Sequence, residues 1–185
     1  CIAMLENERS EKAHLAAVHS LEQLTQIERQ TRDQVTAILT SVIREHRPLK
    51  DKIAESERDL QPRMKDAVIT AIFNVFKRLA ASEPEFETTL DLTEVDIGSH
   101  STAFNDFPPT DFSGSETGIV VWHDNEFNRL TFNNCKIPSF DAFRAEFRDL
   151  SFENSELSNL YLFNATFRHS NFNFKKIPKG RHFGK

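Results

Sequence analysis

The sequence predicts a four-sided β-helical solenoid preceded by an α-helical cap, and two nested periods in its second half are the reason. Between Asn125 and Ile177 the chain repeats itself every twenty residues, as NEFNRLTFNNCKI, AEFRDLSFENSEL and ATFRHSNFNFKKI. Within each block a large apolar residue returns every five positions. A period of five fits neither an α-helix nor a flat strand and therefore indicates a repeat architecture.

The five-residue register extends from Leu92 to Ile177. Fifteen of its eighteen positions hold Leu, Ile, Phe or Trp, whereas an overall apolar content of 38% would give about seven by chance. Four such centres in twenty residues predict one coil with four sides. Stacked coils place equivalent residues about 4.8 Å apart, with backbone hydrogen bonds between the coils. Three positions break the register: Thr102, Thr117 and Ala142.

The repeat predicts which side chains point inward. Phe147 should be fully buried, with Phe127 and Phe167 in the coils on either side. The bulky Phe140 precedes the small centre Ala142, which predicts a large–small exchange and local bulging of the coil. A second inward position, two residues before each centre, is often small: Cys135, Ala145, Ser155, Ala165 and Ser170.

Two units resemble the pattern A-(D/N)-L-x-x of the bacterial pentapeptide-repeat family: AEFRD (residues 145–149) and ATFRH (165–169). LDLTEVDI (90–97) resembles a first unit, and the resemblance extends to Ile177. It implies a right-handed quadrilateral β-helix. The chain departs from the family in having Phe at many centres, and in placing bulky residues where the family keeps small ones: Leu130, Phe140, Leu150 and Leu160.

Three amphipathic helices are predicted before the repeats. The first covers residues 4–29, and the second starts at a capping box, Thr31 to Gln34, and ends at Pro48. The third has Pro62 in its first turn and ends at Pro84. Their apolar stripes are Leu15, Val18, Leu21 and Leu24; Val35, Ile38, Leu39, Val42 and Ile43; and Met64, Val68, Ile72, Val75, Phe76 and Leu79.

The predicted organisation is a helical cap (1–87), a pentapeptide-repeat β-helix (88–178) and a basic tail (179–185). The cap resembles the helical prelude of one group of pentapeptide-repeat proteins. Its expected task is to cover the first coil, whose unpaired backbone and apolar side chains would otherwise invite association. Val35, Ile38, Val42, Ile72 and Phe76 should then share one core. Within the repeat, residues 98–121 are the least regular, and an excursion loop is expected between Asp106 and Gly118.

Charge and cysteine content limit the possible classes of function. The formal net charge is −5, yet the segment from Asp91 to Glu126 has eight acidic residues and no Lys or Arg, whereas Lys175 to Lys185 has five basic residues and no acid. Cys1 and Cys135 form no CxxC motif, so neither a disulfide framework nor a zinc site is indicated. A buried Cys135 in a reducing, cytoplasmic medium is expected. A membrane anchor at the inner face would require a segment before Cys1.

No catalytic signature occurs in the sequence. The seven histidines are scattered, and His14 and His19 are five residues apart, which does not place them on one helix face for a metal. No nucleophile elbow or glycine-rich phosphate loop is present. The sequence therefore predicts a protein that is not an enzyme and that has no cofactor or metal.

Two functions compete. The first is a protein–protein interaction scaffold, with a subunit of a membrane complex as one form of it, because a long repeat surface can be varied without altering the core. The alternative, by resemblance, is a DNA-mimicking inhibitor of the topoisomerase gyrase, which requires a long acidic rod. Nucleic acid is not expected as a partner, because the basic tail lacks interleaved aromatic residues.

A column of aromatic residues one position after the centre marks the predicted interaction site. Phe143, Phe163 and Phe183, here called the aromatic stripe, are twenty residues apart and should point outward. An apolar stripe on an outer face is either covered by the helical cap or the tail, or it is a docking site for another protein or a second copy.

Overall fold

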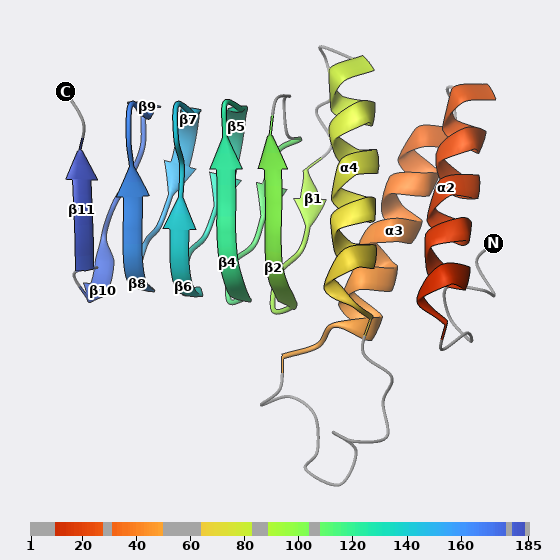
Figure 1. Ribbon diagram of the computed structural model, residues 1–185, viewed down its shortest axis with the longest axis horizontal. Helices are drawn as coiled ribbons and strands as arrows, with labels where there is room; N and C mark the ends of the chain where they lie inside the picture. The colour runs from red at the N-terminus through yellow and green to blue at the C-terminus, as the bar shows by residue number, and fades with distance from the viewer. Residues whose placement is uncertain are drawn as a thin grey trace, which may run out of the picture.

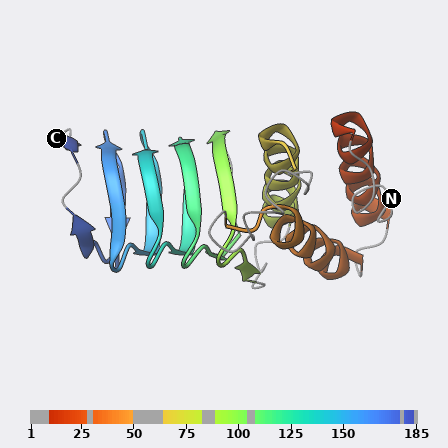
Figure 2. The same ribbon diagram turned by 90° about the horizontal axis from the view of Figure 1, so that it is seen from below.

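The computed structural model describes residues 10–27, 31–49, 64–82, 89–103, 108–176 and 179–183. It consists of helices at one end and a parallel β-solenoid of about four coils at the other (Figures 1 and 2). The helix α4 lies beside the first coil, and the C-terminus lies at the opposite end of the molecule (Figure 1). The predicted β-helix with a helical region before it is therefore confirmed.

The helices are α2 (Glu11–Ile27), α3 (Arg32–His46) and α4 (Asp66–Ser82). Their apolar stripes are buried as predicted, except that Leu24 is 46% exposed and that Leu15 and Ile38 are only partly buried. The predicted capping box is wrong: the Thr31 hydroxyl accepts no hydrogen bond from the first turn of α3 and instead donates one to the Leu24 carbonyl (3.2 Å). It thereby ties the start of α3 to α2. Pro62 and Pro84 lie outside the described residues.

Parallel strands form two sheets along the solenoid. One sheet has the order β1-β3-β5-β7-β9, and the other has the order β10-β8-β6-β4-β2, with β11 also paired to β8. The strands are β1 (Leu90–Asp91), β2 (Asp96–Ala103), β3 (Thr110–Asp111), β4 (Glu116–His123), β5 (Glu126–Thr131), β6 (Lys136–Asp141), β7 (Glu146–Ser151), β8 (Ser155–Leu162), β9 (Thr166–Arg168), β10 (Phe174–Lys176) and β11 (Lys179–Phe183).

Strand pairing confirms the twenty-residue coil. Phe127 pairs with Phe147, which pairs with Phe167. Both inward positions of each five-residue unit are buried from Thr110 to Leu162.

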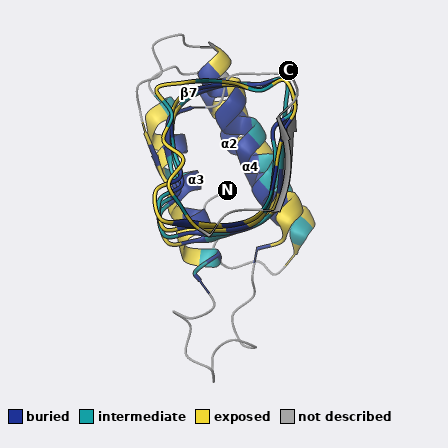
Figure 3. Cartoon of the chain, turned by 90° about the vertical axis from the view of Figure 1, so that its left-hand side faces the viewer, coloured by how far each residue is buried: buried dark blue, intermediate teal, exposed yellow. Residues whose placement is uncertain are grey.

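The corners of the coil have a special backbone conformation. Two residues after many of the repeat centres, φ is positive, as at Asn134 (57°) and at Asn154 (55°) in the next coil. Asn tolerates this conformation better than most residues. When the solenoid is viewed along its axis, successive coils superimpose (Figure 3).

Two expectations about irregular coils are wrong. The predicted excursion between Asp106 and Gly118 overlaps β3 and the start of β4, which pair with the neighbouring coils; residues 104–107 lie outside the described part. No bulge occurs at Phe140, because Ser139, Phe140 and Asp141 keep the twenty-residue register with β8. The small Ala142 leaves room for the ring, so the backbone does not need to move.

The core is a ladder of stacked rings. The Phe147 ring is 1% exposed, and it stacks on Phe127 (centroids 5.0 Å apart) and on Phe167 (5.2 Å). Phe73 of α4 packs edge-on against Phe112 of the second coil (6.4 Å). The apolar core is therefore continuous from the helices into the solenoid.

Candidate functional site

The sequence predicts that all three members of the aromatic stripe point outward, and two of them, Phe143 and Phe163, lie on the outer face of the solenoid. Phe163 is 46% exposed, Phe143 is half-buried, and their rings stack in parallel with centroids 5.4 Å apart. His123, in the preceding coil, packs edge-on against Phe143 (5.7 Å). The Arg144 guanidinium carbon lies 4.7 Å from the centroid of the Phe143 ring. The face therefore offers flat, partly exposed rings in a rigid frame.

The third member of the stripe is displaced along its strand. The backbone of Phe183 in β11 lies opposite Leu162, not opposite Phe163, because the register between β8 and β11 shifts between Lys179 and His182. The side chain of Phe183 lies outside the described part of the structure. The twenty-residue spacing in the sequence thus does not place Phe183 directly beside Phe163.

Tyr161 extends the aromatic surface. It lies near the end of β8, two residues before Phe163, which directly follows that strand; Tyr161 is 37% exposed and Phe163 is 46% exposed. Its partner across the sheet is Asp141, whose Oδ1 lies 3.4 Å from His123 Nε2. Sequence reasoning missed Tyr161, although its place one residue before an inward centre predicts an outward side chain.

The charged side chains of the outer surface form pairs between coils. Lys136 pairs with Glu116 (2.5 Å), Arg148 with Glu126 (3.0 Å) and Lys175 with Glu156 (2.8 Å). Arg144 similarly pairs with Asp124. Three carboxylates of the acidic segment, Glu116, Asp124 and Glu126, are therefore each paired with a base from the following coil.

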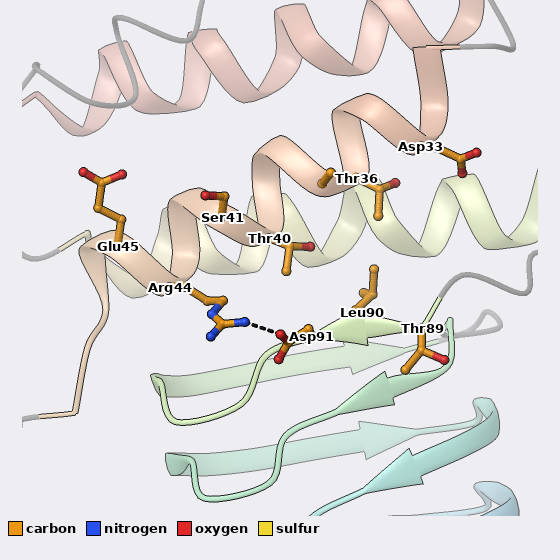
Figure 4. Close-up of a pocket in the computed structure, with 10 residues that line it drawn as sticks. Asp33, Thr36, Thr40, Ser41, Arg44, Glu45, Thr89, Leu90 and Asp91 are labelled. Atoms are coloured by element: carbon orange, nitrogen blue, oxygen red, sulfur yellow. Dashed lines mark hydrogen bonds and ion pairs between the residues drawn. The ribbon is translucent and has the colours of Figure 1, made fainter.

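A groove of about 650 Å³ lies between α3 and the first strand of the solenoid (Figure 4). Thr36, Thr40 and Arg44 line it from one face of α3, because they follow each other at the four-residue spacing of a helix face. Leu90 and Asp91 line it from β1. The Thr36 hydroxyl is buried and makes no hydrogen bond within the described part of the chain. No sequence pattern predicted this groove, because it forms only where α3 lies across the solenoid.

The groove contains an ion pair between Arg44 and Asp91. Partial burial by itself would raise the pKa of Asp91, but hydrogen bonds from Thr93 and the Arg44 guanidinium hold this pKa below its ordinary value. The carboxylate is thus kept ionised and connects α3 to the first coil.

Arg47 is a second connection between the cap and the solenoid. Its side chain is 7% exposed, and it donates to the Asp96 carbonyl (2.7 Å) and to the Asp66 carboxylate (2.8 Å). A Cβ at Gly98 would collide with both Asp66 and Arg47, so the coil needs glycine here. Arg47 comes directly after α3, and nothing local in the sequence predicted its role.

Cys135 is buried, as the sequence predicted, and its thiol donates to the Phe112 carbonyl (2.9 Å). Burial raises the pKa of this thiol to about 12, although backbone hydrogen bonds at Ser115 and Gly114 partly oppose the shift. Such a thiol is not a nucleophile at neutral pH.

Across the described ranges, no three His, Cys, Asp or Glu side chains are grouped so that they could hold a metal ion. No described helix has the length and apolar character needed to cross a bilayer.

No protein-family model, curated protein or solved structure matches the chain. The class of protein is therefore defined by architecture alone: a parallel β-solenoid joined to a helical region.

Proposed function

We propose that this protein is a non-enzymatic interaction scaffold and that its solenoid is a right-handed quadrilateral β-helix of the pentapeptide-repeat kind. The five-residue spacing of buried centres and the twenty-residue strand register support the fold part of this proposal. The helical cap occupies one end of the solenoid, so the side faces of the solenoid remain available to bind a partner.

The observation that carries the function is the stacked pair on the outer face, formed by the exposed Phe163 and the partly exposed Phe143. Monomers seldom leave large aromatic surface in water, and aromatic residues provide much of the affinity in protein–protein interfaces. The neighbouring Tyr161 adds a ring that also carries a hydrogen-bonding group. The partner is therefore another protein that places apolar side chains against these rings.

Rigid support makes this face suitable for docking. The inward residues of β8 are buried (Ser155, Leu157, Leu160 and Leu162), whereas Tyr161 between the last two is exposed. The outward rings can therefore change without altering the inward columns. This separation of surface from core is the general basis for binding by repeat proteins.

Site-specific photocrosslinking in the native host tests the proposal. A photoreactive phenylalanine analogue replaces Phe163 in one strain, and in a matched control strain it replaces Leu24, which has the same 46% exposure on α2. The proposal predicts a discrete adduct from position 163 that is absent from position 24. Phe143→Ser in the same background should reduce the adduct at least tenfold, while circular dichroism stays unchanged.

The outcomes separate the possible occupants of the stripe. An adduct of twice the 21.3 kDa chain mass identifies a second copy, and a different mass identifies another protein. A crosslink to residues of the same chain means that the stripe is covered internally, which contradicts the proposal. Equal adducts from positions 163 and 24 contradict it as well.

Gyrase inhibition by DNA mimicry is the alternative function. The acidic segment from Asp91 to Glu126 favours it, since it has eight acids without Lys or Arg. The pairing of Glu116, Asp124 and Glu126 with bases of the next coil weakens it, because a phosphate-like surface requires exposed, unpaired acids. A supercoiling assay with purified gyrase distinguishes the two functions. If the protein inhibits gyrase in a dose-dependent way, and if the double variant Phe143→Ser/Phe163→Ser inhibits it equally, DNA mimicry is favoured over the interaction scaffold.

A further inference from the structure

The outer face of the strands β4, β6 and β8, which lie side by side in one sheet, carries little charge (Figure 1). Its outward positions are Gly118, Ile119 and Val121 on β4 and the equivalent residues of β6 and β8, and among these nine only Asp141 is charged. The nine equivalent positions ten residues further along the coil hold four charged side chains: Arg129, Arg148, Asp149 and Arg168. The face of β4, β6 and β8 is therefore the better suited of the two to apolar contact.

Apolar side chains stand on the two outer strands of this face. Ile119 on β4 is 55% exposed, and Tyr161 on β8 is an exposed ring. The middle strand, β6, has the short side chain of Ser139, whose partners across the sheet are Ile119 and Asn159. Because β4 and β8 are two strand spacings apart, the larger side chains lie about 10 Å from each other across the sheet. Phe163, which directly follows β8, adds a ring at one end of the face.

An α-helix fits this arrangement better than an added strand does. A helix with its side chains is about 10–12 Å wide, which matches the spacing between the two outer strands. A strand would need free backbone groups, but β6 is paired with β4 on one side and with β8 on the other. Helices are also the usual cover of parallel sheets in proteins.

The size of the face argues against a second copy as the occupant. Three strands of six to eight residues present a surface of about 15 by 20 Å, or about 300 Å². Each partner in a stable dimer typically buries about 800 Å². Two copies docked face to face would therefore bury less than half of what a stable dimer needs, whereas an amphipathic helix binds through a few apolar anchors.

We propose that the face of β4, β6 and β8 binds one amphipathic α-helix of another protein, with the helix axis along β6. Apolar residues at positions i, i+3, i+4 and i+7 of the helix pack against Ile119, Tyr161 and Phe163. A Lys or Arg beside this apolar side pairs with Asp141, whose side chain is 37% exposed. The inference rests on the proposed scaffold function and names the kind of partner that the scaffold binds.

Crosslinking from two positions of the face tests the shape of the occupant. The photoreactive phenylalanine analogue replaces Ile119 in one strain and Phe163 in another, and Arg129 on the opposite face is the control position. We expect positions 119 and 163 to give adducts with the same protein, and position 129 to give none. Mass spectrometry of the digested adducts should place both attachment points within one segment of about 13 residues, the length of helix that spans 20 Å.

A synthetic peptide of the crosslinked segment then tests binding directly. It should bind the purified parent protein and gain helical circular dichroism on binding. Ser139→Arg places a long side chain where the helix lies and should weaken binding at least tenfold. Thr131→Arg, at a half-exposed outward position of β5, is the matched control and should bind as the parent does. Ile119→Ser, which removes only an exposed side chain, should also weaken binding at least tenfold and replaces Ser139→Arg if that variant folds poorly.

Failure of the helix inference is distinguishable from failure of the scaffold proposal. If position 163 gives an adduct while position 119 gives none, or captures a different protein, the scaffold stands and the helix is overturned. An adduct of twice the chain mass, a peptide that binds without becoming helical, or equal binding by the parent and both face variants overturns the helix alone. Absence of adducts from both positions overturns both proposals.

Discussion

Phe147 shows at the scale of one residue how the repeat is stabilised. Its ring is sandwiched between the stacked rings of Phe127 and Phe167, so each coil contributes the same packing to its neighbours. Burial of apolar area and aromatic stacking both act at such a position. The same residue type on the outer face, as at Phe163, has water on one side and contributes less.

Phe147→Ala should lower the free energy of unfolding by about 3–5 kcal/mol, the range for a buried aromatic residue. The loss should loosen the C-terminal coils first, because coils contact mainly their neighbours. Chemical denaturation followed by circular dichroism measures the change. Phe163→Ala is the matched control and should cost far less; if the two substitutions cost the same, the ladder does not stabilise the solenoid as described.

At the scale of elements, the contact between α3 and β1 depends on charge. Asp91 has a pKa held below its ordinary value of about 3.9, so its ionised form favours the folded state. The contribution is fully present above the unfolded pKa, and it is lost as the pH falls through the lower folded pKa. The Arg44–Asp91 pair should therefore weaken only in acid.

Asp91→Asn should lower Tm at pH 7, by an amount equivalent to at most about 1 kcal/mol, because the pair is solvent-exposed. The difference between parent and variant should shrink below about pH 4 and vanish once Asp91 is protonated in the folded protein. Scanning calorimetry from pH 7 to pH 2.5 measures it. Glu153→Gln is the control, because this carboxylate is exposed on the solenoid and forms no ion pair with any described residue; it should leave Tm unchanged over the range. A parent–variant difference that stays constant over the whole range would contradict the assignment.

At the scale of the whole molecule, the helices and the solenoid share one core. Phe73 contacts Phe112, and Arg47 joins α3 to both Asp66 of α4 and Asp96 of the first coil. A solenoid without these contacts would expose the buried residues of its first coil, such as Leu92 and Ile97, together with the edge of β1 that pairs with no other strand.

Deletion of residues 1–87 should therefore make the remaining chain associate. Light scattering coupled to size exclusion should find oligomers or aggregates in place of a monomer, and a dye that binds apolar surface should gain fluorescence. The intact chain under the same conditions is the control. A monomeric, fully folded fragment would mean that covering the first coil is not the task of the helices.

The five-residue period determined the coils, because each inward side chain is specified by a local and repeated position. Ring stacking at Phe147 and burial of Cys135 followed from that period alone. The helix stripes followed in the same way from their own period. The same period specifies the outward positions, so it also predicts that Phe143 and Phe163 lie on the outer face.

Only the tertiary structure decided the features that join distant segments. The register shift that places Phe183 opposite Leu162 depends on how the last strand closes against β8, and spacing alone predicted otherwise. Arg47 and the groove at Thr36 each combine residues from different elements. Their positions are set by how the helices pack on each other and on the first coil. The five-residue repeat begins only at the first coil. Its period therefore carries no information about contacts among the helices or between the helices and that coil.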